Sequence, residues 1–264
     1  MDHSFDIVDE KLAETEFFLR KMAEAGTDMF GFNCYLSAFL SASRTCTLAL
    51  QQFKDEIPGF AEWYEPHRER LKASETARFL LDARNAHVHG GPYPVAGARF
   101  HRKTAEYRFA RSSKTGHEPN EDVVTICRDY FVVLLDIVHD CYVVLGIHID
   151  PQQYYTKENY PGGFIDVAET EVCGWVCESL IEEGFDEDAR WHELRGRLAE
   201  CKINHLFFSY LGKTTPEPIM PEEYEDFAYT PEEKGWLHAP AGFISLEDYQ
   251  LYVAMRNGPT HVTP

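Results

Sequence analysis

Residues 79–91, Phe-Leu-Leu-Asp-Ala-Arg-Asn-Ala-His-Val-His-Gly-Gly, place an arginine on what the pattern predicts to be the buried face of a helix. If residues 71–88 are helical, one apolar stripe with three-and-four spacing is formed by Ala73, Ala77, Leu80, Leu81, Arg84 and Val88. A guanidinium on a core-facing stripe costs several kcal/mol unless it is paired or hydrated. We therefore expect Arg84 to face a carboxylate, a phosphate or a water-filled seam.

Two histidines follow Arg84 within five residues. Positions five apart on a continuous helix point roughly 140° away from each other, so Arg84 and His89 converge only if the helix breaks between them. The run Gly90-Gly91-Pro92 predicts a helix end close by, because glycine tolerates the left-handed cap conformation and proline cannot continue a helix. His87 shares the face of Arg84 if the helix continues, and it is the competing partner.

Four helical patterns fill the first 150 residues and predict a mainly all-α fold, a bundle of antiparallel helices. The first helix is predicted from Val8 to Met22, ending at Gly26, and the second from Phe32 to Leu50, ending at a turn over residues 57–59. The third begins near Ala61 and runs into the Arg84 segment. The fourth runs from about Glu121 to Ile147, with Asn120 as its N-cap.

The segment Arg84-Asn85-Ala86-His87-Val88-His89 at the end of the third helix, together with residues 33–44 of the second, resembles the HEPN family over roughly residues 5–150. The resemblance implies a four-helix bundle. It also implies a metal-independent endoribonuclease, often a toxin or antiviral effector, in which two such motifs meet in one cleft of a homodimer. Other members of that family do not cleave RNA and serve as interaction modules. An antitoxin or another protein partner is a further expectation.

In such an enzyme the catalytic residues are Arg84, His89 and Asn85, and no cofactor or metal is needed. His89 takes the proton from a ribose 2′-hydroxyl or delivers one to the leaving oxygen. Arg84 holds the scissile phosphate and stabilises its extra negative charge. Asn85 orients the substrate or the His89 ring. A symmetric homodimer brings a second copy of the motif across the axis and completes the site.

A basic insertion, residues 92–118, separates the third and fourth predicted helices, and its alternation over residues 99–111 indicates a short hairpin or an extended excursion. Cations and rings are what a nucleic acid with exposed bases requires. The expected substrate-binding residues are His87, Tyr93, Arg99, Arg102, Lys103, Arg108 and Arg111, with RNA as the expected ligand. The alternative is a solvated loop whose aromatic side chains pack on the bundle.

The chain has 264 residues and a formal net charge of −19. Charged residues interrupt the apolar run 123–145, which favours a buried helix over a membrane span. The N-terminus lacks a basic and then apolar signal, so a cytoplasmic location is expected. Cys173, Cys177, Cys201 and His205 could ligate a metal, but packing in the core is the favoured interpretation of all seven cysteines. Motifs for nucleotide-binding glycine loops, zinc peptidases and serine hydrolases are absent.

Residues 151–264 are expected to form an acidic extension or a small helical domain, separate from a bundle domain of residues 1–150. Helices are predicted over residues 167–183, 187–209 and 246–256. Cys201, Ile203, Leu206, Phe207 and Tyr210 have the pattern of core residues.

The competing class of function is a non-catalytic helical module that binds a protein partner or a nucleotide. In that case Arg84 pairs with a carboxylate such as Asp82 or Asp136. The overall negative charge favours this alternative, because nucleic-acid-binding proteins usually present a positive surface.

Overall fold

A computed structural model describes residues 5–101, 104–111, 119–176, 184, 186–199 and 201–216. Within these residues the protein is mainly helical, with a small sheet of two antiparallel strands. The predicted class, mainly all-α, is confirmed at that level. All described residues belong to one compact unit, residues 1–220. The predicted division at residue 150 stays a prediction.

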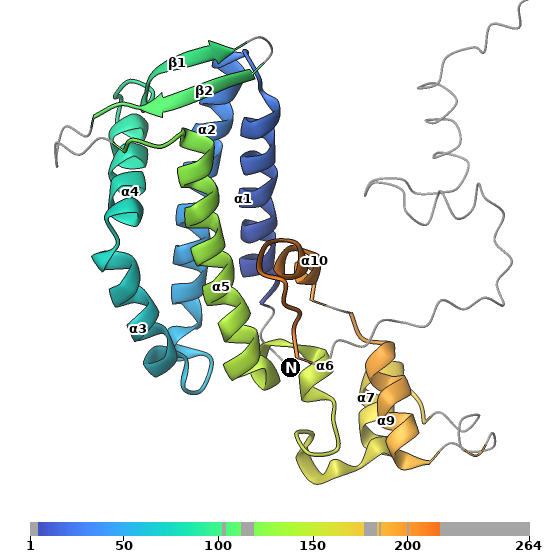
Figure 1. Cartoon of the computed structure of the whole chain (residues 1–264). Helices are drawn as coiled ribbons and strands as arrows, with labels where there is room; N and C mark the ends of the chain where they lie inside the picture. The colour runs from blue at the N-terminus through green and yellow to red at the C-terminus, as the bar shows by residue number, and fades with distance from the viewer. Residues whose placement is uncertain are drawn as a thin grey trace, which may run out of the picture. The chain divides into compact units, whose positions relative to one another are not determined.

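The bundle alternates in direction (Figure 1). The chain ascends α1 (Asp6–Glu24), descends α2 (Met29–Gln52), ascends α3 (Phe60–Ala73) and α4 (Glu75–Val88), and descends α5 (Val123–Ile149). A short 3₁₀ turn, η1 (Phe53–Asp55), follows α2. The hairpin β1 (Val95–His101) and β2 (Thr104–Phe109) connects α4 to α5 at the end of the bundle where α2 begins and α4 ends.

The third predicted helix is wrong in one respect, because it is two helices broken at Ser74. The Ser74 backbone is extended, with φ −67° and ψ 122°, and its side chain accepts the N–H of Ala77 at 3.2 Å. A serine that caps a new helix competes with continuation of the old one. On α4 the buried face is therefore Ala77, Phe79 and Leu80, whereas Val88 is exposed.

The fourth predicted helix is confirmed as α5, although its N-cap is Asp122 and not Asn120. One oxygen of Asp122 accepts the N–H groups of Val124 and Thr125, at 3.0 and 3.3 Å, and the other accepts the N–H of Tyr107 at 2.9 Å. The same carboxylate therefore starts α5 and attaches the hairpin to it.

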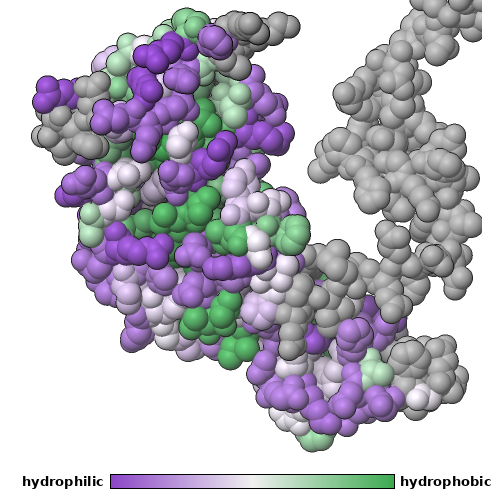
Figure 2. All heavy atoms as spheres, viewed as in Figure 1, coloured by the Kyte–Doolittle hydropathy of each residue, from purple (hydrophilic) through white to green (hydrophobic). Residues whose placement is uncertain are grey.

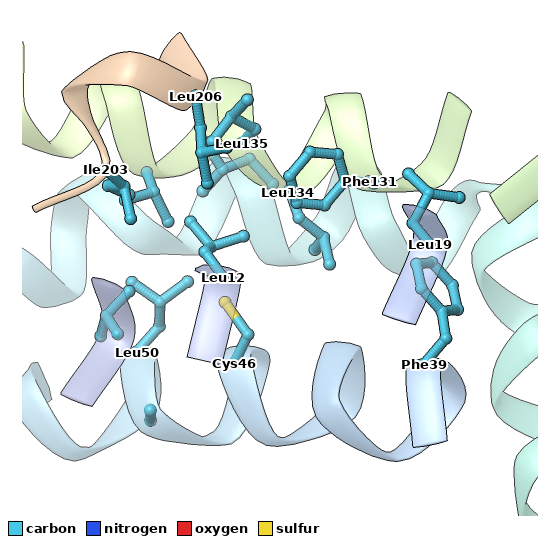
Figure 3. Close-up of a cluster of buried hydrophobic side chains, with 14 of the residues drawn as sticks. Leu12, Leu19, Phe39, Cys46, Leu50, Phe131, Leu134, Leu135, Ile203 and Leu206 are labelled. Carbon is cyan, nitrogen blue, oxygen red and sulfur yellow. The ribbon is translucent and has the colours of Figure 1, made fainter. Parts of the chain in front are cut away.

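α5 is long and apolar enough to cross a membrane by length and composition, and 56% of its most apolar 18-residue window is buried. Exposed apolar side chains near its C-terminal end are Val143, Val144 and Ile147, and Figure 2 shows hydrophobic surface over the course of α5. Burial of Phe131, Leu134 and Leu135 among side chains of other helices identifies α5 as the central core helix of the bundle (Figure 3).

Residues beyond α5 contribute to the same core. In Figure 3, Ile203 and Leu206 lie beside Leu135 of α5 and Leu12 of α1. Phe207 is fully buried, and the partly buried Cys201 and Tyr210 pack against the same cluster. The predicted core residues of this segment are therefore confirmed.

A second hydrophobic cluster lies around α7 (Ile165–Cys173) and α9 (Glu187–Gly196). It also involves α6 (Pro151–Tyr154) and the turn η2 (Pro161–Gly163), and its buried members are Tyr155, Tyr160, Ile165, Ala168, Trp191 and Leu194. The helix predicted over 167–183 ends at Gly174, whose φ of 84° suits a left-handed cap. Residues 177–183 and the predicted helix 246–256 lie outside the described residues.

The helix predicted over residues 187–209 is also wrong as a single element. After α9 the chain forms turns, then α10 (Asn204–Leu206) and a π-helical turn η3 (Phe207–Leu211). Backbone bonds from Arg197 to Leu194 and from Leu198 to Arg195 close the end of α9 with tight turns. The apolar pattern continues across this break because the residues on both sides of it are buried.

Candidate functional site

The C-terminal end of α4 forms a Schellman motif. The N–H of Gly91 donates to the carbonyl of Ala86 at 2.9 Å, and the N–H of Gly90 donates to the carbonyl of His87 at 3.2 Å. Gly90 has a φ of 92°, and a Cβ added to Gly91 would lie 2.5 Å from the Ala86 oxygen. Both glycines are therefore required by the backbone, and the predicted helix stop is confirmed.

The turn follows His89 rather than preceding it. The N–H of His89 still donates to the carbonyl of Asn85 at 3.2 Å, as in a regular helix. Arg84 and His89 of one chain consequently keep the diverging directions of a continuous helix. His89 is exposed, whereas His87 is half-buried and lies one turn after Arg84. Within one chain the structure brings Arg84 together with His87 rather than with His89.

Arg84 is half-buried, as its place on the apolar stripe predicts. Its Nη1 donates to the side-chain oxygen of Asn85 at 3.1 Å, and its Nε is buried without a hydrogen-bond partner among the described residues. No carboxylate in the described part of the chain pairs with it. Asp136, one suggested partner, instead pairs with Lys213 at 3.0 Å and with Arg70 at 3.9 Å. The expectation of a structural Arg84–Asp136 pair is therefore wrong.

His87 is held by an aromatic contact. Its ring stacks on the ring of Tyr93 with centroids 4.6 Å apart and an interplanar angle of 28°. Tyr93 lies close to Cys34 of α2, and the proximity of that thiol raises the pKa of Tyr93. The Nδ1 atom of His87 is buried and has no hydrogen-bond partner within the described residues.

Sequence reasoning missed two residues of α2 in this region. Cys34 contacts Tyr93, and the adjacent Asn33 has a buried side-chain oxygen that lacks a partner in the described part of the protein. We call Cys34, Arg84, His87 and Tyr93 the polar cluster. The signal in the sequence is weak, because two polar residues beside a core phenylalanine are common on any amphipathic helix.

The hairpin presents one apolar and one polar face, since residues paired across antiparallel strands point to the same side. Tyr107, opposite Ala98, is buried; its ring stacks on Phe32 with centroids 3.6 Å apart, and its hydroxyl donates to the Gly26 carbonyl at 2.9 Å. Phe109 is also buried, against Phe79. These two aromatic side chains therefore pack on the bundle and are not available for stacking on bases.

Basic side chains lie on the other face of the hairpin. Arg99 pairs in register with Glu106, and Arg108 pairs in register with Gly97. Arg99 and Arg111 are exposed, and the Arg108 side chain lies 3.8 Å from Glu106. Phe100 of β1 and Tyr93, just before β1, are exposed rings, at 54% and 38%. Arg102 and Lys103 lie outside the described residues.

The described residues contain no grouping of three or more His, Cys, Asp or Glu side chains suited to a metal ion. The six cysteines among them are free thiols, and Cys177 lies outside this set. Burial raises the pKa of Cys46, to about 12, and also that of Cys127, which keeps both thiols protonated.

Residues 4–95, from the start of the chain to the first residue of β1, match the model of a protein family described as Bacteriophage lambda protein ea47. No curated protein and no solved structure matches the chain. The matched segment contains both stretches on which the HEPN resemblance rested, residues 33–44 and 84–89. The assignment to the HEPN family was therefore wrong, and the family description itself states no activity.

Proposed function

We propose that the protein binds RNA at the polar cluster and the outer face of the hairpin, and that it cleaves a phosphodiester bond there without a metal ion. The observation that carries this proposal is the half-buried pair Arg84 and His87, one helical turn apart, whose Nε and Nδ1 atoms have no hydrogen-bond partner among the described residues. A phosphate supplies the acceptors that a guanidinium and an imidazole N–H require. Exposed Arg99 and Arg111 extend the positive surface for neighbouring phosphates.

The proposed reaction is attack of a ribose 2′-hydroxyl on the adjacent phosphorus. A histidine accepts the hydroxyl proton, the new P–O bond forms, and the bond to the 5′-oxygen breaks as that oxygen takes up a proton. Arg84 binds the phosphate and stabilises its developing charge. The products are a 2′,3′-cyclic phosphate and a 5′-hydroxyl end, so the atoms balance without a co-reactant.

The divergence of Arg84 and His89 within one chain motivates a composite site in a homodimer. We propose that Arg84, Asn85 and His87 of one subunit face His89 of the partner subunit across a two-fold axis. Each of the two symmetric sites then uses residues of both chains. This arrangement keeps the roles expected of Arg84 and His89 although the helix continues between them.

A second candidate is a non-catalytic module that binds a nucleotide or a phosphorylated partner. Two observations favour it: the burial of Tyr107 and Phe109, which removes rings from the basic face, and the net charge of −19. Both candidates use the same phosphate contacts. They differ in whether a bond is broken.

The first experiment incubates the protein with end-labelled single-stranded RNA in excess EDTA. Arg84→Gln and His89→Asn are each expected to lower cleavage by at least about a hundredfold. Matched controls are Arg78→Gln, an exposed arginine of the same helix, and His192→Asn, an exposed histidine of α9. DNA of the same sequence should bind without being cut, because it lacks the 2′-hydroxyl. Arg84-dependent binding without cleavage of any RNA would instead support the second candidate.

Mixing two inactive variants tests the composite site. In a heterodimer of Arg84→Gln and His89→Asn chains, one of the two sites regains an intact Arg84 and His89. Since about half of randomly paired dimers are mixed, about one quarter of the wild-type activity should return. Failure to regain activity in a demonstrated mixed dimer would contradict the composite site while leaving RNA cleavage itself open to the first experiment.

A further inference from the structure

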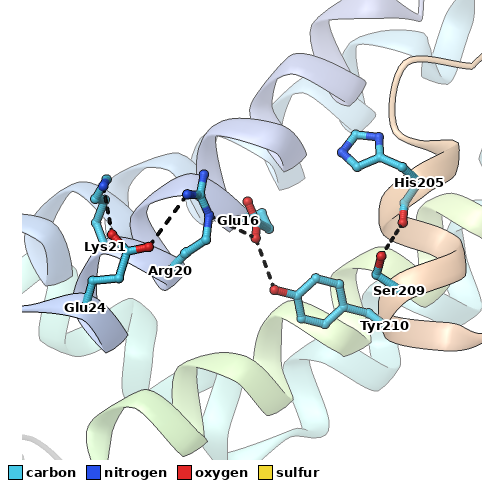
Figure 4. Close-up of polar contacts among 7 residues, drawn as sticks. All are labelled: Glu16, Arg20, Lys21, Glu24, His205, Ser209 and Tyr210. Atoms are coloured by element: carbon cyan, nitrogen blue, oxygen red, sulfur yellow. Dashed lines mark hydrogen bonds and ion pairs between the residues drawn. The ribbon is translucent and has the colours of Figure 1, made fainter. Parts of the chain in front are cut away.

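Residues 201–216, which we call the strap, lie across α1 and α5 and are anchored by several polar contacts. The Tyr210 hydroxyl donates to Glu16 of α1 at 3.2 Å, and Figure 4 shows that Arg20 reaches the same carboxylate. His139 of α5 bonds to the Thr214 carbonyl at 2.9 Å, and Lys213 bonds to Asp136 at 3.0 Å. These anchors lie toward the end of the strap.

A single carboxylate oxygen joins the start of the strap to both helices. Asp9 Oδ2 of α1 accepts the Tyr142 hydroxyl of α5 at 2.8 Å and the Cys201 thiol of the strap at 3.8 Å. Asp9 is only 2% exposed. Its second oxygen, Oδ1, is buried with no hydrogen-bond partner among the described residues. An ionised carboxylate in this position carries charge that two weak neutral donors on one oxygen do not compensate.

The groups around Asp9 do not supply a buried cation. Those that face it are Asp6 on α1, Cys46 on α2, Cys141 and Tyr142 on α5, and Cys201 and Lys202 on the strap. Lys202 lies on the outside, where it pairs with Asp6 at 3.0 Å and with Glu10 at 3.6 Å. Desolvation therefore dominates and raises the pKa of Asp9 to about 7.

We propose that Asp9 is a proton-controlled latch for the strap: the protonated side chain holds the strap on α1 and α5, and ionisation favours its release. Release would let water solvate the carboxylate. It would also uncover the apolar contacts of Ile203, Leu206 and Phe207 with the bundle. The more distant anchors at Tyr210, Lys213 and Thr214 limit how far the strap can move. The latch is independent of the proposed RNA chemistry.

The sign of the effect follows from proton binding. The closed strap keeps Asp9 protonated up to about pH 7, whereas an open strap lets it ionise near its ordinary value of 3.8. Opening therefore becomes easier as the pH rises, by up to about tenfold per pH unit between pH 5 and pH 7, and levels off above that range.

Hydrogen exchange of the full chain from pH 5 to pH 8, corrected for intrinsic rates, tests the latch. As the pH rises, the protection of amides 203–211 is expected to fall in the wild type and to stay constant in Asp9→Asn. Amides in the middle of α2 should keep their protection in both proteins. His139→Gln, which changes the anchor to the Thr214 carbonyl, should retain the wild-type slope. Three results would each overturn the proposal. They are strap protection that does not depend on pH in the wild type, the same pH dependence of strap protection in Asp9→Asn as in the wild type, and an equal loss of protection in α2.

A second variant keeps the test decisive if Asp9→Asn does not fold. Tyr142→Phe removes the stronger of the two donors to Asp9 and so raises the carboxyl pKa further. The fall in strap protection should then continue to a higher pH than in the wild type. If strap protection stopped falling at the same pH in Tyr142→Phe and in the wild type, control of the strap by Asp9 would be contradicted.

Discussion

At the residue scale, two buried carboxylates have different surroundings, and the difference predicts different responses to mutation. Glu169 of α7 is 1% exposed and receives two hydrogen bonds from Arg190 of α9, at 2.9 and 2.7 Å. Asp166 bonds to the same guanidinium at 2.6 Å. Glu169 is thus a buried charge with a dedicated partner, and these carboxylates raise the pKa of Arg190 in return. Asp9 has no such cationic partner among the residues that the structure describes.

We expect Arg190→Met to lower the free energy of unfolding by about 3–5 kcal/mol, because it removes the buried cation that compensates the charge of Glu169. Arg197→Met, two turns further along at the C-cap of α9, is the matched control. Arg197 is exposed and pairs with Glu193 at the surface, so the loss should be below about 1 kcal/mol. Urea unfolding followed by circular dichroism measures both. Equal losses in the two variants would show that the buried pair has no special role.

The global stability of the wild type should fall relative to Asp9→Asn as the pH rises from about 4 to about 7. The folded carboxyl binds its proton more tightly than the unfolded one, so unfolding releases a proton across this range. The pH-dependent loss of stability of the wild type relative to Asp9→Asn reaches at most about 4 kcal/mol and is constant above pH 7. Chemical denaturation at pH 5 and pH 8 checks the sign. If the wild type instead became more stable relative to Asp9→Asn as the pH rises, Asp9 would be ionised in the folded protein.

At the element scale, the ends of helices follow local side-chain chemistry that the apolar pattern does not record. The hydrophobic pattern predicts the bundle helices. The run Gly90-Gly91-Pro92, and not that pattern, predicts the end of α4. The hydrophobic pattern also has limits. It does not predict the break at Ser74 or the turns after Gly196, because buried side chains continue on both sides. Nor does it predict that Tyr93 links Cys34 to His87, which depends on how α2 and α4 meet.

For the candidate site, the half-buried position of Arg84 could be predicted from its stripe, whereas its surroundings could not. A pattern indicates which face a residue occupies but not what lies opposite that face. The same limit applies to the hairpin. Alternation indicated a short hairpin or an extended excursion, and only tertiary packing shows that Tyr107 and Phe109 belong to the core and Arg99 to the solvent face.

Asp122 offers a test of how a cap can join two elements. Asp122→Ala removes the N-cap of α5 and also the acceptor for the Tyr107 N–H of β2. We expect a loss of about 2 kcal/mol or more, compared with about 1 kcal/mol for Asp186→Ala, a cap of α9 with a single bond to the Ala189 N–H. Thermal unfolding measures the difference. Equal losses would indicate that the hairpin is held by Tyr107 packing alone.

At the scale of the whole molecule, the strap makes the core depend on residues far along the sequence. Phe207 is fully buried and meets the rings of His139 and Tyr142 edge-on, at centroid distances of 5.1 and 5.8 Å. The next residue, Phe208, is 67% exposed. Two phenylalanines adjacent in sequence therefore provide a matched pair, one in the core and one at the surface.

We expect Phe207→Ala to destabilise the bundle by about 3–5 kcal/mol, as for other fully buried phenylalanines, and Phe208→Ala to change stability by less than about 0.5 kcal/mol. Because α1, α5 and the strap share one core, Phe207→Ala should lower the midpoint of the whole bundle transition while unfolding remains a single step. Circular dichroism and intrinsic fluorescence, recorded together against urea, would give coincident curves. If instead the strap alone detached in the variant and the bundle kept its wild-type midpoint, the strap would be an accessory to a bundle that is stable without it.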